Sequence, residues 1–341
     1  MVNIGLIGFG LSGRYFHASF IKVNPRLNLS KVMTSKPESV KDFDDTIEVV
    51  NDADSILNDS SIDLVFICTP NDSHFNYALR ALQAGKNVVI EKPFANSVSE
   101  AELLIQEAEK RNLVLTAYQN RRWDADFLTV QKVLASGELG EIVEFESHYD
   151  RFRLEVLSDT WKELPAAGAG NLYNLGPHLI DQALVLFGTP KTVTAKIKTI
   201  RPAGKTDDYF DIALDYEDKR IILKSSILAF NNDLRYVIHG TKGSFIKNGL
   251  DVQEPVLKTN VLPNIPNWGK EPENMYGNLY TTNGNRIIES ELGNYTPFYD
   301  NLADAILDKK PLLITPQQAL NTTKIIELAQ KSNQLNQTVQ F

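Results

Sequence analysis

The first residues constrain this chain most, because a strand pattern runs straight into three glycines at a fixed spacing. The apolar run Ile4–Ile7 is followed by a G-x-G-x-x-G loop, made of Gly8, Phe9, Gly10, Leu11, Ser12 and Gly13. The first glycine permits a sharp turn, the second lets a pyrophosphate approach the backbone, and the third lets the next helix pack closely on the strand. A helix-compatible run, Arg14–Lys22, comes next. The stretch predicts a dinucleotide-binding strand–turn–helix, with a tight structural turn as the alternative.

Length and charge limit the remaining possibilities. A chain of 341 residues predicts two domains, which we place at residues 1–120 and 121–341. The net charge of −8 argues against binding to nucleic acid or to an anionic membrane, because both need a basic face. The single cysteine, Cys68, excludes an intramolecular disulfide and fits a reducing compartment. With neither a signal peptide nor a membrane-length apolar run in view, the cytoplasm is the expected location.

The first third alternates strand and helix patterns, as a doubly wound parallel sheet requires. After the glycine loop we expect strands at 27–34, 63–69, 87–91 and 113–117, separated by helices at 73–84 and 97–111 and by a short helix within 52–61. Ser97 and Glu100 form a capping box, and Gly85 stands where a C-terminal cap belongs. This part of the chain predicts a Rossmann domain.

The rest predicts an α+β domain with a large, open, mostly antiparallel sheet. We expect helices at 124–136, 175–187, 296–307 and 316–335, and strands at 142–150, 193–201, 208–216, 220–228, 235–239 and 244–247. Strand 142–150 alternates like a half-exposed antiparallel strand. Residues 151–170 form a polar, glycine-rich connection. Residues 251–285 carry prolines, asparagines and glycines without periodicity and are interpreted as a long loop.

The end of the second strand bears on the choice of dinucleotide. In this fold an acidic residue there selects NAD, since it binds the ribose 2′-hydroxyl and would repel a 2′-phosphate. This chain instead has Thr34, Ser35 and Lys36, two hydroxyls and an ammonium that suit a phosphate. We therefore expect NADP rather than NAD, with a solvated surface lysine as the alternative interpretation of Lys36.

Two further stretches follow parallel strands, where such a sheet presents residues to a ligand. They are Cys68–His74 and Glu91-Lys92-Pro93. Partial desolvation at a strand end would lower the pKa of Lys92 and prepare it for proton transfer. The alternative is a lysine whose ammonium group reaches water.

Five stretches together make the chain resemble the Gfo/Idh/MocA family of nicotinamide-dependent oxidoreductases. They are G-F-G-L-S-G at 8–13, C-T-P-N-D-S-H at 68–74, A-G-K-N-V-V-I-E-K-P-F at 84–94, Y-Q-N-R-R-W-D at 118–124 and L-G-P-H-L-I-D-Q at 175–182. The chain is most similar to the branch that contains NADP-dependent scyllo-inositol dehydrogenases. The resemblance implies a Rossmann domain followed by an α+β domain, with dimers or tetramers formed through the large sheet.

The resemblance also implies residue roles. Lys92 matches the lysine that holds and polarises the reacting oxygen, and His178 matches the histidine that accepts the proton when an alcohol is oxidised, which suits general acid–base chemistry. For His178 the alternative is a partly buried structural histidine near a helix start. The loop beside the cofactor matches Cys68, Thr69, Pro70, Asn71 and His74, and further cofactor contacts match Glu91, Lys92, Gln119, Asn120 and Arg122.

One position departs from the family pattern. Inositol dehydrogenases carry aspartate four residues before this histidine, where the present chain has Asn174. Asparagine can orient a hydroxyl and cap a helix that begins at Pro177, but it cannot take a proton or stabilise a neighbouring cation by charge. We therefore expect lower pKa values for Lys92 and His178 than in an aspartate-bearing relative, and a substrate that need not be an inositol.

Five other residues could line a sugar or polyol pocket, with core packing or ion pairing as the alternative for each: Trp123, Tyr149, Arg151, Arg153 and Trp161. Asp181 and Gln182 are interpreted as orienting groups. The five histidines form no ligand-spaced cluster, so no metal site is expected. The leading hypothesis is an NADP-dependent oxidoreductase that interconverts a secondary alcohol and a ketone on a sugar or cyclic polyol. The alternatives are a dinucleotide-binding sensor without turnover, and a reductase of a C=C or imine substrate.

Overall fold

The computed structural model describes residues 1–157, 160 and 163–341 and divides into two compact units. The first contains Met1–Asn120, Gln253–Trp268 and Asn294–Leu320, and the second contains Arg121–Val252, Gly269–Gly293 and Asn321–Phe341. Two later segments, which sequence analysis placed in the second domain, thus pack with the first unit. Each unit is described by itself.

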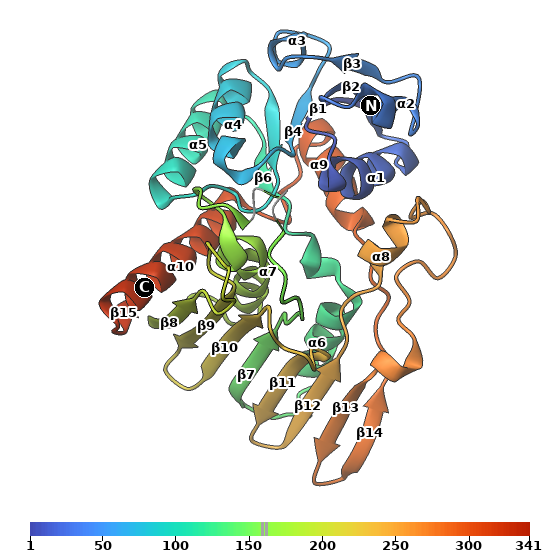
Figure 1. Cartoon of the computed structure of the whole chain (residues 1–341). Coiled ribbons are helices and arrows are strands. Elements are labelled where there is room, and N and C mark those ends of the chain that lie inside the picture. The colour runs from blue at the N-terminus through green and yellow to red at the C-terminus, as the bar shows by residue number, and fades with distance from the viewer. Residues whose placement is uncertain (158–159, 161–162) are drawn as a thin grey trace. The chain divides into compact units, whose positions relative to one another are not determined.

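The first unit is built on a six-stranded parallel sheet (Figure 1). Its strands are β1 (Val2–Ile7), β2 (Leu27–Met33), β3 (Glu48–Val50), β4 (Leu64–Ile67), β5 (Asn87–Ile90) and β6 (Leu115–Ala117). Their order, β3-β2-β1-β4-β5-β6, is that of a doubly wound dinucleotide-binding fold, which confirms the predicted Rossmann domain. All four residues of β4 are buried, as expected of a strand covered on both faces.

Helices cover both faces of this sheet (Figure 1). The helical elements of the first unit are η1 (Ser12–Ala18), α1 (Ser19–Val23), α2 (Pro37–Lys41), α3 (Asp54–Leu57), η2 (Asn71–Ser73), α4 (His74–Gln83), α5 (Val98–Arg111), α8 (Gln253–Leu257) and α9 (Thr296–Leu307). The predicted cap of α5 is present, since the Ser97 hydroxyl accepts the Glu100 N–H at 3.2 Å. The Glu100 carboxylate in turn accepts the Asn96 N–H at 2.9 Å. α9 packs against β1 and α1, which explains why residues 294–320 belong here.

The second unit is built on a nine-stranded sheet in the order β14-β13-β12-β11-β7-β10-β9-β8-β15. The strands are β7 (Ile142–His148), β8 (Thr192–Lys198), β9 (Tyr209–Asp215), β10 (Arg220–Ser226), β11 (Leu234–Gly240), β12 (Gly243–Asn248), β13 (Gly277–Thr281), β14 (Gly284–Ile288) and β15 (Val339–Gln340). The described pairs are antiparallel except β7 with β10, so strand 142–148 pairs parallel on one side, contrary to its prediction. The mostly antiparallel α+β class is confirmed.

The described helical elements of the second unit are η3 (Asn120–Trp123), α6 (Ala125–Ala135), α7 (Gly170–Phe187), η5 (Glu273–Met275) and α10 (Pro316–Leu335), of which η3 and α10 each begin in the first unit. The helices α6, α7 and α10 pack on one face of that sheet. Phe127 of α6, Leu179 of α7 and Ile325 of α10 share a core with Phe145 and Leu223 of the sheet. No helix of the described residues is long and apolar enough to cross a membrane.

The expected long loop at 251–285 is wrong in part. It contains α8 and most of a hairpin, in which β13 pairs antiparallel with β14. The turn ends at Gly284, whose φ of 116° lies in the region that favours glycine. Thr282 and Asn283 separate the two strands, and the Asn283-Gly284 pair at the start of β14 is a turn signal that was visible in the sequence.

Candidate active site

The ends of five neighbouring strands bring the predicted cofactor residues of the first unit to one edge of its sheet. The hydrogen bonds of the first residue beyond each strand show this: Gly8 donates to the Met33 carbonyl at 2.9 Å, Cys68 to Ile7 at 2.8 Å, Glu91 to Ile67 at 3.0 Å and Tyr118 to Ile90 at 2.9 Å. The glycine loop, Thr34, Thr69, Lys92 and Gln119 therefore follow adjacent strands at the carboxyl edge. This is where an open parallel sheet binds its ligands.

The three glycines have distinct environments. Gly8 has a φ of 100°, and a Cβ there would lie 2.7 Å from the Cys68 carbonyl oxygen. A Cβ on Gly13 would clash with the Gly8 carbonyl and touch the Leu6 side chain. A Cβ on Gly10 would meet no other atom within 4 Å, so its surroundings leave room for a close approach to the backbone. These are the geometries that the spacing predicts.

The other loop residues differ in exposure. Phe9 is buried with its ring edge against Phe43, whereas Leu11 is exposed. The Ser12 hydroxyl binds the Cys68 thiol, although burial and the charge of Glu91 still raise the pKa of that thiol. The helix that follows opens as a π-helix, Ser12–Ala18, before it continues as α1. The residues of the loop thus pack on the segment after β4.

A cation that the sequence analysis did not single out, Arg14, contacts the segment after β2. Ser35 and Lys36 are exposed, and the Thr34 hydroxyl accepts the Lys36 N–H at 3.1 Å. Arg14, just after the glycine loop, places Nη1 3.0 Å from the Ser39 hydroxyl. The guanidinium of Arg14 therefore lies beside the start of α2, next to the predicted phosphate-binding residues. Its place directly after the third glycine was the available signal.

The loop after β4 is held by its own side chains. Ser73 Oγ lies 2.7 Å from the Thr69 hydroxyl and 2.8 Å from the Pro70 carbonyl. Asn71 is buried, and its carbonyl accepts a hydrogen bond from Asn96 at 2.9 Å. His74 is buried, with Nδ1 2.9 Å from the Pro93 carbonyl and Nε2 2.9 Å from the Thr69 carbonyl. Both ring nitrogens of His74 thus face backbone, and the ring links this loop to the one that bears Lys92.

Glu91 and Lys92 follow β5. Glu91 is buried, and its Oε2 accepts the Lys92 backbone N–H at 3.0 Å. Its Oε1 lies 3.0 Å from His17 Nε2. Burial raises the pKa of Glu91, but the hydrogen bond and charge of His17 and the charge of Lys92 bring it below its usual value. Lys92 is half-buried, and its peptide bond to Pro93 is cis.

The remaining predicted contacts lie along the chain after β6. Gln119 and Asn120 are buried. Arg122 makes two hydrogen bonds to Asp181, from Nε at 2.8 Å and from Nη2 at 2.7 Å. Gln182 donates to the Arg121 carbonyl at 2.8 Å. Asp181 and Gln182 of α7 therefore hold the η3 turn.

The predicted start of α7 is wrong. The helix begins at Gly170, so Asn174 is its fifth residue and Pro177 lies inside it. Asp207 caps the helix, because its carboxylate accepts the Leu172 N–H at 2.6 Å and its carbonyl accepts the Asn171 N–H at 2.8 Å. Burial raises the pKa of Asp207 to about 6. Asn174 cannot act as a cap there, but it precedes the buried His178 by four residues on the same helix face.

The five candidates for a sugar pocket separate into different environments. Tyr149 is buried, with the guanidinium carbons of Arg121 and Arg151 each 5.2 Å from its ring centroid. Arg153 forms an ion pair with Glu163 at 2.5 Å. Trp123 is half-buried in η3, and Trp161 lies outside the described residues. Core packing thus accounts for Tyr149, and ion pairing accounts for Arg153.

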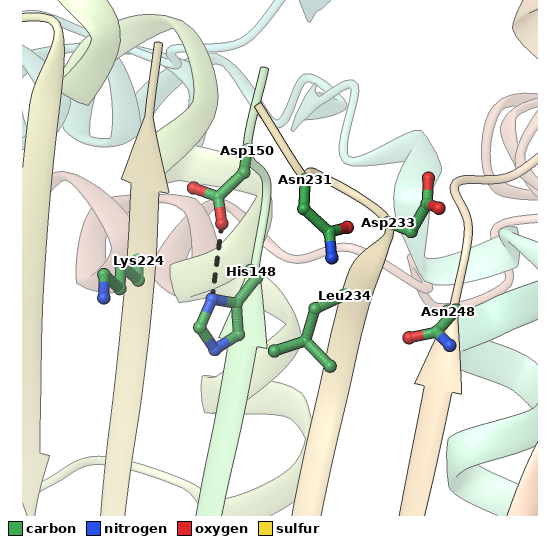
Figure 2. A pocket seen from close by; sticks show the side chains of 7 residues that line it. All are labelled: His148, Asp150, Lys224, Asn231, Asp233, Leu234 and Asn248. Carbon is green, nitrogen blue, oxygen red and sulfur yellow. Dashed lines mark ion pairs between the residues drawn. The ribbon is translucent and has the colours of Figure 1, made fainter. Parts of the chain in front are cut away.

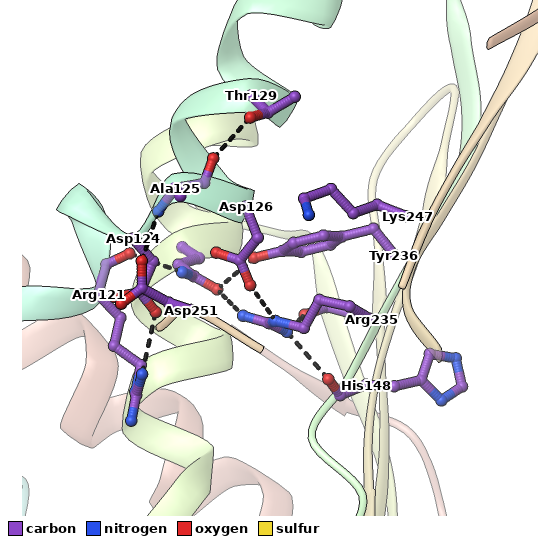
Figure 3. Close-up of polar contacts among 12 residues, drawn as sticks. Arg121, Asp124, Ala125, Asp126, Thr129, His148, Arg235, Tyr236, Lys247 and Asp251 are labelled. Atoms are coloured by element: carbon purple, nitrogen blue, oxygen red, sulfur yellow. Dashed lines mark hydrogen bonds and ion pairs between the residues drawn. The ribbon is translucent and has the colours of Figure 1, made fainter. Parts of the chain in front are cut away.

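A buried polar network of the second unit also escaped prediction (Figure 3). Arg235 of β11 is 1% exposed and donates to Asp126 Oδ2 at 2.7 Å and to Gln182 Oε1 at 2.9 Å. The same Gln182 oxygen accepts the Tyr236 hydroxyl at 2.9 Å. The network joins α6, α7 and β11, and it fixes the helix that carries His178. No local pattern shows such a network, because its members are far apart in sequence.

The second unit also contains a polar cavity of about 520 Å³ (Figure 2). It is lined by His148, Asp150, Lys224, Asn231, Asp233, Leu234 and Asn248. His148 lies 2.9 Å from a carboxylate oxygen of Glu146 and 3.5 Å from one of Asp150. Burial lowers the pKa of His148, but these two carboxylates raise it above its ordinary value. The lining contains none of the predicted site residues.

The residues present fit a dinucleotide at the edge of the first sheet. Gly8 turns sharply, Gly10 leaves room beside the backbone, and helical N–H groups follow at Ser12 and beyond. In the part of the chain that the structure describes, no group of three His, Cys, Asp or Glu side chains could hold a metal ion.

Comparison with known proteins agrees with this geometry. The family model for the oxidoreductase family NAD-binding Rossmann fold matches residues 2–119, and that for the oxidoreductase family C-terminal alpha/beta domain matches residues 131–341. The chain belongs to the Gfo/Idh/MocA oxidoreductase family.

Individual relatives match over nearly the whole length. Scyllo-inositol 2-dehydrogenase (NADP(+)) IolW of Bacillus subtilis is 39% identical over 343 residues, which cover 99% of this chain and 95% of that protein. The solved structure of the oxidoreductase yvaA from Bacillus subtilis has a TM-score of 0.96 at 38% identity and covers 100% of this chain and 98% of that one. The oxidoreductase YPO2259 from Yersinia pestis has a TM-score of 0.94 at 39% identity, with 100% and 97% covered. The present protein is an NAD(P)-dependent dehydrogenase or reductase with the family's two domains.

Proposed function

We propose that this protein is an NADP-dependent oxidoreductase that interconverts a secondary alcohol and a ketone on a sugar or cyclic polyol. The observation that carries the proposal is the sheet edge of the first unit, where the glycine loop and Lys92 follow adjacent parallel strands. In a member of this family, the glycine loop can bind the dinucleotide, and a lysine at this position can stabilise negative charge on the reacting oxygen of the substrate.

The reacting residues of this chain have complementary roles. The Lys92 ammonium holds the substrate oxygen and stabilises negative charge that develops on it. A ring nitrogen of His178 takes the hydroxyl proton when the alcohol is oxidised and returns it when the ketone is reduced. Nicotinamide, when bound, supplies the hydride chemistry. Asn174, one helical turn before His178, donates or accepts a hydrogen bond to a substrate hydroxyl but carries no proton of the reaction.

Three features support NADP over NAD. The end of β2 has no carboxylate before Glu38, and Ser35 and Lys36 are exposed there. The guanidinium of Arg14 contacts Ser39, which follows Lys36 closely in the chain. A relative 39% identical to this chain carries NADP(+) in its name. Hydroxyl and cationic donors favour a 2′-phosphate through charge-assisted hydrogen bonds.

The same relative is named for scyllo-inositol, which supports a hydroxyl-rich ring as the substrate class. We also propose that the protein forms a homodimer or homotetramer through the large sheet. Val237 pairs with Ile246 across that sheet, and Ile222 lies on the far side of Glu146, which pairs with both Val237 and Ile222. The three apolar residues are each adjacent in their strands to a core residue and so lie on the face opposite the helices. Apolar residues grouped on an open sheet face suit a second copy of this chain.

Turnover tests the proposal directly. The protein is mixed with NADP or NAD and a panel of inositols and sugars, and reduced cofactor is followed by its absorbance. We expect turnover of a polyol with NADP, and loss of about 100-fold or more in kcat in both Lys92→Met and His178→Asn, with cofactor binding retained. Cofactor binding without turnover of any member of the panel would instead support the non-catalytic sensor.

A further inference from the structure

His17 lies at the centre of a buried chain of polar contacts that ends at Lys92. Its side chain is fully buried, with Nδ1 3.0 Å from the Tyr299 hydroxyl and Nε2 3.0 Å from Glu91 Oε1. The other oxygen of Glu91 accepts the Lys92 backbone N–H at 3.0 Å. All of these residues belong to the first unit. The contacts form a continuous path from α9 through η1 to the residue that follows β5.

The protons along this path can be assigned from the donors and acceptors. The Tyr299 hydroxyl is 2.6 Å from the Phe16 carbonyl, which can only accept, so the single hydroxyl proton of Tyr299 lies there. His17 Nδ1 must then donate its own proton to the Tyr299 oxygen. Nε2 therefore needs a second proton to bind the carboxylate of Glu91, unless Glu91 itself is protonated.

The surroundings of Glu91 favour the charged pair. The pKa of Glu91 is lowered despite its burial, and burial raises the pKa of Tyr299 far above its usual value, so that hydroxyl keeps its proton. The other titratable groups whose charges act on these residues are Lys92, His74, Cys68 and Tyr118. Cys68 and Tyr299 are neutral at pH 7, because burial raises both pKa values.

Packing holds the ring of His17 in this orientation. The imidazole lies 4.3 Å from the Tyr118 ring and 4.8 Å from the Phe66 ring, measured between centroids. Phe20 stacks on Tyr299 at 5.1 Å with an interplanar angle of 4°. His17 is also the last residue but one of the π-helix that follows the glycine loop. The cofactor loop, the positioning histidine and the catalytic lysine are therefore connected within one unit.

We propose that His17 and Tyr299 are positioning residues for Lys92, which they act on through an imidazolium–carboxylate pair between His17 and Glu91. The proposal rests on the role of Lys92 in the proposed function. The pair neutralises Glu91 and fixes the backbone at Lys92, so that the ammonium of Lys92 faces the substrate and is not drawn to the buried carboxylate. Loss of the imidazolium leaves Lys92 as the nearest cation to Glu91, which favours the protonated form of Lys92.

The protonation of His17 can be measured without any substrate. In protein labelled with ¹⁵N-histidine, the His17 signals are assigned by their absence in His17→Gln. We expect both ring nitrogens of His17 to carry protons at pH 7. A ring with one unprotonated nitrogen would overturn the proposal.

Kinetics test the consequence for Lys92 in the full-length protein. We expect His17→Gln to lower kcat at least ~5-fold and to move the alkaline limb of the kcat profile up by about half a pH unit. Cofactor affinity should stay within about twofold, because none of the described side-chain contacts of His17 or Tyr299 is made to a residue of the glycine loop. Tyr299→Phe should cause a smaller shift of the alkaline limb in the same direction. This variant tests the proposal if His17→Gln does not fold.

The matched control is Tyr216→Phe. It also removes a hydroxyl that donates to a backbone carbonyl, at 2.8 Å from Gly188, but it lies in the second unit. Its profile should match that of the unmodified protein. If His17→Gln and Tyr299→Phe match it too while Lys92→Met loses turnover, the proposal is wrong and the proposed function stands. If Lys92→Met keeps full turnover, the proposed role of Lys92 fails and the positioning role fails with it.

Discussion

Arg122 binds Asp181 through both Nε and Nη2, at 2.8 and 2.7 Å. The guanidinium comes from the η3 turn and the carboxylate from α7, two segments 59 residues apart. Both side chains are nearly buried, so water cannot readily take the place of either partner. Loss of one partner therefore lowers the stability of the fold. The pair ties the turn to the helix that carries Asn174 and His178.

Removal of one partner should therefore destabilise the protein strongly. We expect Asp181→Asn to lower the free energy of unfolding by about 2–4 kcal/mol, because it leaves a buried guanidinium without its counter-ion. Arg122→Lys should cost less, since a lysine keeps the charge but loses the two-point geometry. Urea denaturation at pH 7 measures both. Glu217→Gln, in an exposed pair with Lys191, is the control, and an equal effect there would contradict the argument.

The cofactor preference depends on two cations near the end of β2. We expect Arg14→Ala and Lys36→Ala each to lower kcat/KM with NADP by about 10-fold while kcat/KM with NAD changes little, because only NADP has a 2′-phosphate. Lys41→Ala, at the exposed end of α2, is the matched control. A parallel fall with both cofactors would show that the cations do not read the phosphate. A preference of the unmodified protein for NAD would refute the NADP assignment itself.

Asn174 provides a test of how strongly its position is coupled to the chemistry. In Asn174→Asp a carboxylate stands one turn before His178 and favours the imidazolium, so the limbs of the rate profile should move up by about 0.5–1 pH unit. The measurement is kcat against pH for both proteins, with Asn58→Asp, an exposed change of equal charge, as control. Identical profiles would mean that position 174 does not influence the reacting groups.

His148 should make stability depend on pH in a defined direction. Its folded pKa is raised above the ordinary value of 6.5, since Asp150 and Glu146 outweigh burial. A raised pKa means that its contribution is fully present below pH 6.5 and is lost as pH rises through the folded pKa. We expect His148→Gln to cost about 1 kcal/mol at pH 6 and much less at pH 9, measured by urea denaturation.

The control for this prediction is His239→Gln. The Nδ1 atom of His239 binds the Ser244 hydroxyl at 2.8 Å, and no carboxylate is paired with it among the described contacts. Its effect on stability should not change with pH in the same way. An effect of His148→Gln that is equal at pH 6 and pH 9 would mean that the ion pairs contribute nothing.

Local patterns predicted those parts of the fold that depend on neighbours in the sequence. The glycine loop, the buried strand β4 and the cap at Ser97 each follow from a few adjacent residues, and the structure confirms them. α9 and α10 were predicted with the bounds that the structure shows. Hydrophobic periodicity and capping residues suffice for such elements.

The errors arose where a distant residue decides the local structure. Proline favours the first turn of a helix, so Pro177 predicts a helix start. The helix instead begins seven residues earlier, at Gly170, because the distant Asp207 caps it there. The cofactor role of His74 stays a prediction, but the orientation of its ring also depends on a distant partner, the Pro93 carbonyl in the next strand-end segment. Neither contact can be read from a pattern, because each is formed only when strands and helices are assembled.

The first compact unit is assembled from three separate stretches of chain, and this has a consequence for gene fusions and chimeras. Thr116 at the end of the parallel sheet donates to the Ile314 carbonyl at 2.7 Å, and Trp268 meets the ring of Phe20 edge-on at 6.2 Å. A hybrid enzyme joined by one crossover after residue 120 would take the parallel sheet from one parent. The segments Gln253–Trp268 and Asn294–Leu320, which pack with that sheet in the native protein, would come from the other parent. Exchange of this module between homologues needs three grafts, so recombination at a single junction should rarely yield a working hybrid.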